Sequence, residues 1–536
     1  MIMKKILYLV VFLVFGWSCS DFLEEDAQNL TYVNSIDDLD QVLIGEGYVV
    51  ASYQERDKWN SSVPAWIHLL DDDVRFAGMG MAPDYSSCSA IYAWQRDPWK
   101  GGLTDDDLGA RDNQAWSELY KHINALNIIL YEAEEFKNEP DYNRIKGEAY
   151  FLRATYYWWL VNIYSKAYDV KTAEEEPGVP LKLSPFVEDY EEEGGFSRAK
   201  VAEVYEQIVA DLKEAVRLLS GYERKSVYRA SKEAARLFLS RVYLHMENYE
   251  GVINECDSLL QNNSYRLDDY TLLEDNLQSL ITSYSPEVIF SQGGYRLRYF
   301  FGSDGYVRGD EIDWETATGM FYIPFVPYYG VSDDLIDAFN DDQLVPDQSK
   351  ERDIRYKVGC CEVTDMTIFS VSVLPAKLKK WSDGGVSDCF TLRLAEAYLN
   401  KAEALAAVGR EEEANQLWQE LRRYRILEQE PVVLRGENLM AAIRTERRLE
   451  FNFEGFRWLD LRRYAVNSKY PQKKEITHIW LWQGNEELGT TGGQETYELA
   501  PYGEDPAWVF PIPADEHRLN TRFEFNEERN EREAVK

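Results

Sequence analysis

The sequence lacks an excess of positive charge. Its 536 residues contain 58 Lys and Arg against 94 Asp and Glu, which gives a formal net charge of −36 at pH 7. Proteins that bind nucleic acid need a basic surface to neutralise phosphates, so this balance excludes nucleic acid as a partner. We assign most of the surplus acidic residues to the solvated surface.

Cysteine and histidine are also scarce, with six Cys and five His in the chain. The histidines are scattered without ligand spacing and no CxxC motif occurs, so the sequence predicts no zinc site. If Cys19 carries a lipid, an odd number of cysteines remains and their disulfide state stays open. A Cys361–Cys389 bridge is one possibility among Cys88, Cys256, Cys360, Cys361 and Cys389.

Catalytic signatures are missing as well. The chain contains no GxSxG, HExxH or Walker loop. Glycoside hydrolysis needs two carboxylates in one cleft, but with 94 acidic residues chance pairs are too abundant to be informative. The sequence therefore predicts a protein that is not an enzyme and that needs no cofactor.

One long apolar run occurs, and it lies at the N-terminus. Lys4 and Lys5 precede the apolar residues 6–15, and Cys19 follows the small residues Gly16 and Ser18. This pattern resembles a bacterial lipoprotein signal, which is cut before a cysteine that then takes a lipid. We predict a signal peptide over residues 1–18 and a lipidated acidic tether over residues 19–34. The alternative is an ordinary secretory signal in which Cys19 is incidental.

Apolar and aromatic residues are abundant, at 45% and 14% of the chain. A chain of this length can bury a large core and keep aromatic residues for its surface. Apolar residues recur at helical spacing after Ser35, from Trp116 to Leu130, and from Val201 to Leu219, where Ser197 is a plausible N-cap. Residues 149–164 are aromatic on all sides, which is typical of a buried helix.

Two stretches have the pattern of helical hairpins. Residues 231–246 and 249–260 form the first predicted pair, and residues 391–408 and 411–424 form the second. Small alanines lie where the helices must approach, as in tetratricopeptide-type pairs. The pairs are not tandem, so we predict a mainly α fold with a compact helix-pair scaffold rather than a solenoid.

Long inserts rich in Gly, Pro, Ser, Asp and aromatic residues interrupt this scaffold. We predict one domain over residues 35–536, with the scaffold at about 35–262 and 386–466. The irregular, ligand-facing inserts are expected at about 71–110, 265–385 and 467–536. Loops of such length are usually functional or disordered, and their aromatic content argues against disorder.

Five segments, in order, resemble the SusD/RagB family of surface lipoproteins of Bacteroidota. The longest is the helix–turn–helix segment IRTERRLEFNFEGFRWLDLRRY at residues 443–464. The others are CSDFLE at 19–24, GEAYFLRA at 147–154, RLAEAYLNKAEA at 393–404 and FPIP at 510–513. Together they span nearly the whole mature chain.

The resemblance implies a SusD-like fold and a location on the cell surface, anchored by lipid at the outer membrane. It implies a protein that captures oligo- or polysaccharide and delivers it to a TonB-dependent SusC-like transporter. Peptide capture, as in RagB-like members, is the alternative. A glycoside hydrolase or a periplasmic helical-repeat adaptor is less consistent with the aromatic-rich loops.

The charged residues of the 443–464 segment have a structural explanation. Charges in residues 446–450 stand at i, i+3 and i+4 and are expected to pair along one helix. Arg457 and Asp460 stand three apart and are expected to bridge the turn. We therefore predict that Glu450 and Arg457 stabilise the fold rather than contact ligand.

Candidate ligand contacts lie in the inserts, because glycan-binding members of the family bind through loops that project from the scaffold. A sugar ring suits a flat aromatic beneath it and polar groups at its rim. A packing role remains open for each single aromatic. The acidic run at 71–73 is interpreted as a loop cap or a cation site. The candidates are Asp72, Asp73, Arg75, Trp94, Arg96, Trp99, Tyr295, Arg296, Tyr299 and Trp314.

Overall fold

A computed structural model provides the structure of the chain. It describes residues 33–48, 65–76, 89–99, 114–186, 196–273, 280–293, 301, 329–341, 343–346, 348–365, 370–375, 377, 390–482, 493–514, 516 and 523–535. Every structural statement below concerns these residues. Cys19, Cys88 and Cys389 lie outside them, whereas Cys256 and Cys360 are buried and make no disulfide.

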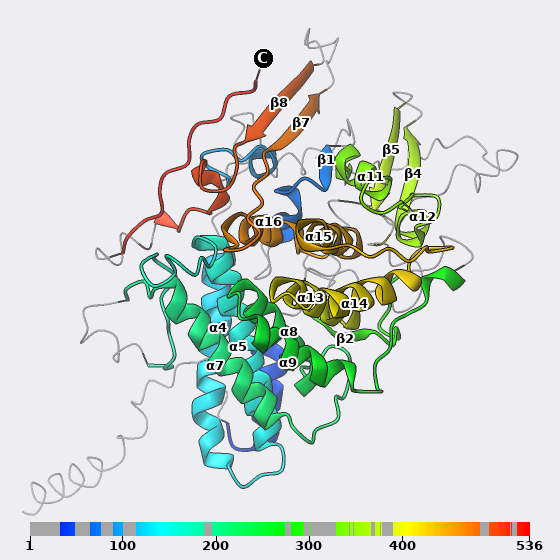
Figure 1. Ribbon diagram of the computed structural model, residues 1–536. Coiled ribbons are helices and arrows are strands. Elements are labelled where there is room, and N and C mark those ends of the chain that lie inside the picture. Colours follow the sequence, from blue (N-terminus) through cyan, green and yellow to red (C-terminus); the bar gives the residue numbers. More distant parts are fainter. Residues whose placement is uncertain are drawn as a thin grey trace, which may run out of the picture.

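The prediction of a mainly α fold is confirmed (Figure 1). Helices α4, α5, α7, α8, α9, α13 and α14 fill one side of the molecule, and α15 and α16 run across its middle. Most of the short strands lie on the other side, but β2 lies among the helices. The longer helices are α4 (Gln114–Glu132), α5 (Tyr142–Tyr164), α7 (Val201–Leu218), α8 (Lys232–His245), α9 (Tyr249–Leu260), α13 (Leu394–Ala407), α14 (Glu411–Arg423), α15 (Gly436–Phe451) and α16 (Arg457–Val466). The shorter ones are α2 (Ile36–Val42), α3 (Ser89–Tyr92), α11 (Asp333–Phe339) and α12 (Ile354–Gly359).

Helix α5 is the centre of the N-terminal half. It is buried on all sides from Gly147 to Tyr164 apart from Tyr150, as the all-round aromatic pattern predicts, and it packs against α4 and α7. The Ser35 hydroxyl caps α2 by accepting a hydrogen bond from the Asp38 amide. The prediction of Ser197 as the N-cap of α7 is wrong. The cap is Lys200, whose amide donates to the Glu203 carboxylate at 2.6 Å.

Both predicted helical hairpins are present, as α8–α9 and α13–α14, and α13 packs against α9 to join them. Glu247 and Gly409 turn the two hairpins with positive φ angles of 55° and 85°. The second pair begins three residues later than predicted. Residues 391–393 form strand β6 (Thr391–Arg393), which pairs with β2 (Val288–Ser291) before the helix starts.

The predicted irregular inserts contain ordered antiparallel strand pairs, which the sequence patterns did not indicate. Strand β1 (Val74–Phe76) of the first insert pairs with β3 (Tyr329–Val331) of the second, with Val74 opposite Val331. Strand β4 (Cys360–Asp365) pairs with β5 (Ser370–Pro375), and β7 (Ile476–Trp482) pairs with β8 (Gly493–Leu499). Pairing of β1 with β3 joins two inserts that are far apart in sequence.

No helix of the described part of the chain is both long and apolar enough to cross a membrane. The buried apolar residues form one main cluster, which extends from α2 through the helix pairs to the β7–β8 hairpin. A smaller cluster lies around Tyr270, Val288 and Ile354.

Candidate ligand-binding region

The acidic run at residues 71–73 connects the first insert to the α15–α16 helix pair. It lies between a short 3₁₀ helix (Ala65–Leu69) and β1. The Asp72 carboxylate accepts two hydrogen bonds from Arg457, Nε to Oδ1 at 2.6 Å and Nη2 to Oδ2 at 2.7 Å. Lys474 donates to Asp72 at 2.6 Å, and Arg448 donates to Asp73 at 2.6 Å. Asp72 and Asp73 thus form ion pairs with Arg and Lys side chains inside the protein.

The three carboxylates differ in protonation behaviour because their partners differ. Burial alone would raise the pKa of Asp72, but Arg448 and Arg457 outweigh it and hold that pKa well below its ordinary value. Among the described residues, Asp71 forms no ion pair like those of Asp72 and Asp73. Burial and the adjacent Asp73 and Asp72 carboxylates raise the pKa of Asp71 well above its ordinary range.

The acidic run also acts as a cap, as one of the two interpretations predicted. The Asp71 carboxylate accepts the Asp73 amide at 3.0 Å. Although one oxygen from each of the three carboxylates lies within 4.8 Å of the others, Arg and Lys side chains already neutralise Asp72 and Asp73. This arrangement fits a salt-bridged junction better than a cation site.

Arg75 lies on β1 and is directed to the second insert, where it forms an ion pair with Asp333 at 3.1 Å. Asp333 is 79% exposed in its side chain, so this contact is at the surface. Arg75 therefore lies beside the region where the inserts meet.

Trp94 is a core side chain rather than an exposed platform. It is fully buried, its ring stacks on His478 with 4.1 Å between centroids, and its indole N–H donates to the Leu70 carbonyl at 3.1 Å. Burial lowers the pKa of His478 to about 4, so the stacked imidazole is neutral at pH 7. The packing alternative therefore holds for Trp94, and we do not retain it as a binding residue.

Arg96 is exposed and forms an ion pair with Glu528 at 2.7 Å, which ties the first insert to the C-terminal segment. Trp99 is half-buried and packs edge-on against Trp66, with 5.4 Å between centroids. The centroid of the Phe510 ring lies 5.5 Å from that of Trp99 and 4.3 Å from that of Trp66. This group of three rings leaves part of Trp99 accessible to solvent.

Four of the predicted contacts, Tyr295, Arg296, Tyr299 and Trp314, lie outside the described residues. Trp66 was not predicted. Its position five residues before the acidic run, in the apolar stretch 65–70, is the one sequence signal that could have found it. Trp99 with Trp66 and Phe510 is therefore the described part of the candidate site.

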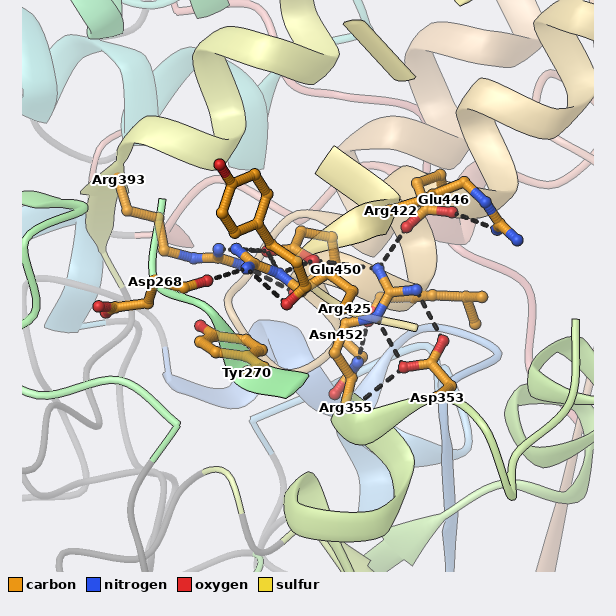
Figure 2. Close-up of polar contacts among 12 residues, drawn as sticks. Asp268, Tyr270, Asp353, Arg355, Arg393, Arg422, Arg425, Glu446, Glu450 and Asn452 are labelled. Carbon is orange, nitrogen blue, oxygen red and sulfur yellow. Dashed lines mark hydrogen bonds and ion pairs between the residues drawn. The ribbon is translucent and has the colours of Figure 1, made fainter. Parts of the chain in front are cut away.

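The family-like helix pair contains a buried charge cluster (Figure 2), which we call the central charge cluster. Glu450 of α15 accepts hydrogen bonds from Arg355, Arg393 and Arg425, which come from three different segments. Burial would raise the pKa of Glu450, but Arg425, Arg393 and Arg355 together hold it well below its ordinary value. Further members are Glu287, Arg422 and Glu446, together with Asp353 and Glu454, which pair with Arg355 and Arg393.

The predicted structural role of Glu450 and Arg457 agrees with these contacts, but their predicted partners are wrong. Charges of residues 446–450 pair with other elements instead of along α15: Glu446 with Arg355 and Arg422, and Arg448 with Asp73. Arg457 pairs with Asp72 rather than with Asp460. Asp460 instead pairs with two arginines, Arg447 and Arg463.

Two family models match the chain in order. The model described as starch-binding associating with outer membrane matches residues 21–244, and the model described as SusD family matches residues 369–528. SusD-like protein P38 of Formosa agariphila is 24% identical over 72% of this chain and 82% of its own length. SusD-like protein P25 of the same organism is 25% identical over 48% of this chain, and the match spans 46% of that relative.

Solved structures show the same fold. A SusD-like carbohydrate binding protein from Bacteroides vulgatus superposes with a TM-score of 0.65, covering 91% of this chain and 97% of that chain at 21% identity. The family models and relatives agree with this likeness, and the chain belongs to the SusD family.

Proposed function

We propose that the protein captures a glycan at the cell surface without cleaving it and delivers it to a TonB-dependent outer-membrane transporter. Its membership of the SusD family carries this proposal, because one matching model is described as starch-binding and one related structure as carbohydrate binding. The half-buried Trp99, supported by Trp66 and Phe510, supplies an aromatic surface of the kind that stacks on a sugar face.

The anchoring expectation follows from the N-terminal sequence. A lipid on Cys19 would hold the chain at the outer membrane, with residues 20–26, of which four are acidic, as the start of a tether. Stable anchoring takes more than one acyl chain, which a bacterial lipoprotein cysteine supplies. The transporter would then be a membrane neighbour that meets the rigid helical scaffold.

The binding test uses the mature protein and a panel of neutral oligosaccharides: maltoheptaose, cellohexaose, mannohexaose and xylohexaose. We expect calorimetry to detect binding of at least one of them, and a reducing-end assay to detect no turnover. Trp99→Ala should weaken that binding about tenfold, since one stacked aromatic contributes on the order of 1.4 kcal/mol. Tyr131→Ala, at a 54% exposed tyrosine on α4, is the control and should bind normally.

Three results would contradict this proposal. Sustained hydrolysis that a single carboxylate substitution abolishes would make the protein an enzyme. Binding of a tryptic casein digest but of no saccharide would favour the peptide alternative. The transporter part fails if the protein is recovered alone from native membranes in mild detergent while the transporter is shown to be expressed.

A further inference from the structure

A polar cavity lies on the helical scaffold, outside the candidate site described above. It has a volume of about 530 Å³, within the range of sites that bind small ligands. It opens where α9 ends and α13 begins, beside the residues that follow α14. Its lining includes Tyr265, Tyr398 and Tyr424, together with Asp268 and Asp269. We call it the tyrosine cavity.

The wall that carries the two aspartates is held rigidly by the central charge cluster. The Arg425 guanidinium lies 3.9 Å from the centre of the Tyr270 ring and donates to the Asp268 carbonyl at 2.6 Å. Tyr270 donates through its amide to the Tyr424 carbonyl at 3.0 Å and through its hydroxyl to Glu287 at 3.1 Å. This anchoring fixes the cavity wall before any ligand arrives, which lowers the entropy cost of binding.

Figure 2 shows the Asp268 carbonyl facing Arg425, while the Asp268 carboxylate points away from the central charge cluster. Burial and the nearby Glu287 carboxylate raise the pKa of Asp268 above its ordinary value. Asp269 uses one carboxylate oxygen to accept the amide and hydroxyl of Thr271. The cavity thus has hydrogen-bond acceptors, the carboxylates of Asp268 and Asp269, at fixed positions beside partly exposed tyrosine rings.

The rim of the cavity exposes apolar surface. Leu272 lines it and is 74% exposed, which makes it one of the most exposed large apolar residues in the described part of the chain. A second cavity of about 370 Å³ begins on the other side of the same turn, at Thr271, and is lined by Gln419 and Arg423 of α14. The two hollows flank one short 3₁₀ turn (Tyr270–Leu272).

The chemistry of the lining selects among ligands. Tyrosine rings offer flat faces for the C–H side of a sugar, and aspartate oxygens accept hydrogen bonds from its hydroxyl groups. Two carboxylates and one guanidinium, that of Arg266, give the lining a net negative charge. Uronic acids and sulfated sugars would be repelled, so the cavity suits neutral sugars.

We propose that the tyrosine cavity is a second saccharide-binding subsite, which takes one or two neutral sugar units of a polysaccharide. The inference rests on the proposed glycan-binding function and adds a location and a ligand class to it. Two subsites on one chain engage the same polymer together, so they raise the affinity for polysaccharide above that for short oligosaccharides.

Counting bound trisaccharides tests the inference, because a trisaccharide is too short to occupy both subsites at once. Equilibrium dialysis of the mature protein with radiolabelled maltotriose, cellotriose, mannotriose and xylotriose gives the number of molecules bound per chain. For a trisaccharide that binds, we expect two per chain. The double variant Tyr398→Ala/Tyr424→Ala should bind one. Trp99→Ala leaves the tyrosine cavity intact, so it should keep one site of unchanged affinity beside one that is about tenfold weaker.

Leu272→Arg is the second variant, since its exposed position should tolerate the change while the long side chain blocks the cavity mouth. It should also reduce the count to one and weaken binding of the matching polysaccharide at least tenfold, whereas Tyr131→Ala keeps both sites. One bound trisaccharide per chain, unchanged in Leu272→Arg, would overturn the subsite while the proposed function stands. Absence of any saccharide binding would overturn both.

Discussion

Arg457 and Asp72 form a bidentate ion pair between residues 385 positions apart in sequence, at 2.6 and 2.7 Å. Arg457 begins α16, and Asp72 precedes β1 of the first insert. This contact assigns a role to the arginine of the family-like segment: it positions the insert from which the candidate site is built. Loss of the ion pair should therefore lower the stability of the fold and release the first insert from its position.

Removing Arg457 deprives the buried Asp72 of its bidentate partner. We expect Arg457→Ala to lower the free energy of unfolding by about 3–5 kcal/mol, as is usual when one member of a buried pair is removed. Arg217→Ala removes the exposed i,i+3 pair with Glu214 and should cost less than about 1 kcal/mol. Urea denaturation compares the two. Equal losses would contradict the buried-junction interpretation.

The two tryptophans of the first insert should respond differently to truncation. Trp94→Ala removes a fully buried ring stacked on His478, and we expect a loss of about 3–5 kcal/mol in unfolding free energy. Trp99→Ala should lose much less stability but bind the glycan more weakly, because Trp99 is half-buried. Thermal unfolding beside calorimetry separates them. A stable Trp94→Ala variant that fails to bind would restore Trp94 as a contact residue.

Glu450 balances three guanidinium groups in the central charge cluster. Glu450→Gln keeps the size of the side chain but leaves Arg355, Arg393 and Arg425 without their shared carboxylate. We expect a loss of about 3–5 kcal/mol in unfolding free energy. Glu214→Gln, at an exposed position of α7, is the matched control and should change the urea midpoint little. A neutral effect of Glu450→Gln would show that the cluster contributes no net stability.

Acid should weaken the fold through the same cluster. The pKa of Glu450 is held well below its ordinary value in the folded chain, so its stabilising contribution is complete above about pH 5. It is lost as the pH falls through the unfolded value of about 4.3 toward the depressed folded value. The pKa of Asp71 is raised in the folded chain, so Asp71 acts in the opposite sense. It destabilises the fold as the pH rises from its unfolded pKa of about 3.9 toward the raised folded value.

Urea denaturation between pH 3 and pH 7 measures this dependence. We expect the unfolding free energy to fall below about pH 4.5. The fall should be smaller in Glu450→Gln, which has no carboxyl group to protonate at this position. The same slope in both proteins would assign the acid sensitivity to other carboxylates.

Lipidation can be tested independently of binding. Cys19→Ala removes the thiol that we propose as the lipid acceptor, and we expect the variant to leave the membrane fraction and become undetectable on whole cells by surface protease digestion. Ser18→Ala keeps the cysteine and is the control. Unchanged membrane fractionation and surface protease sensitivity of the Cys19→Ala variant would show that another feature anchors the chain.

Local patterns predicted the helices well because each depends on residues a few positions apart. The Ser35 cap, the all-round burial of α5 and both helical hairpins follow from spacing and small-residue positions. The start of α13 was predicted three residues early. Leu392 continues the apolar pattern, but pairing of β6 with the distant β2 takes these residues out of the helix.

Distant contacts explain what could not be predicted. Nothing near Arg457 in sequence indicates Asp72 as its partner, whereas Asp460 stands at the spacing that helices favour. Trp94 lies in a polar, turn-rich segment, which suggested exposure. It is buried because His478 of β7, 384 positions later, packs against it. The tyrosine cavity likewise combines residues from four segments whose individual patterns indicate only helix ends and a loop.

The central charge cluster also affects the order in which the chain can fold. Helix pairs α8–α9 and α13–α14 use contacts between near neighbours, which form early because little loop entropy is lost. The cluster needs Glu287, Arg393 and Glu450 together, and it cannot close until residue 450 has been synthesised. Until then its arginines and glutamates remain hydrated and the helix pairs are not yet fixed to the inserts. We therefore expect closure of this cluster to come late in folding and to help fix the preformed hairpins to the inserts.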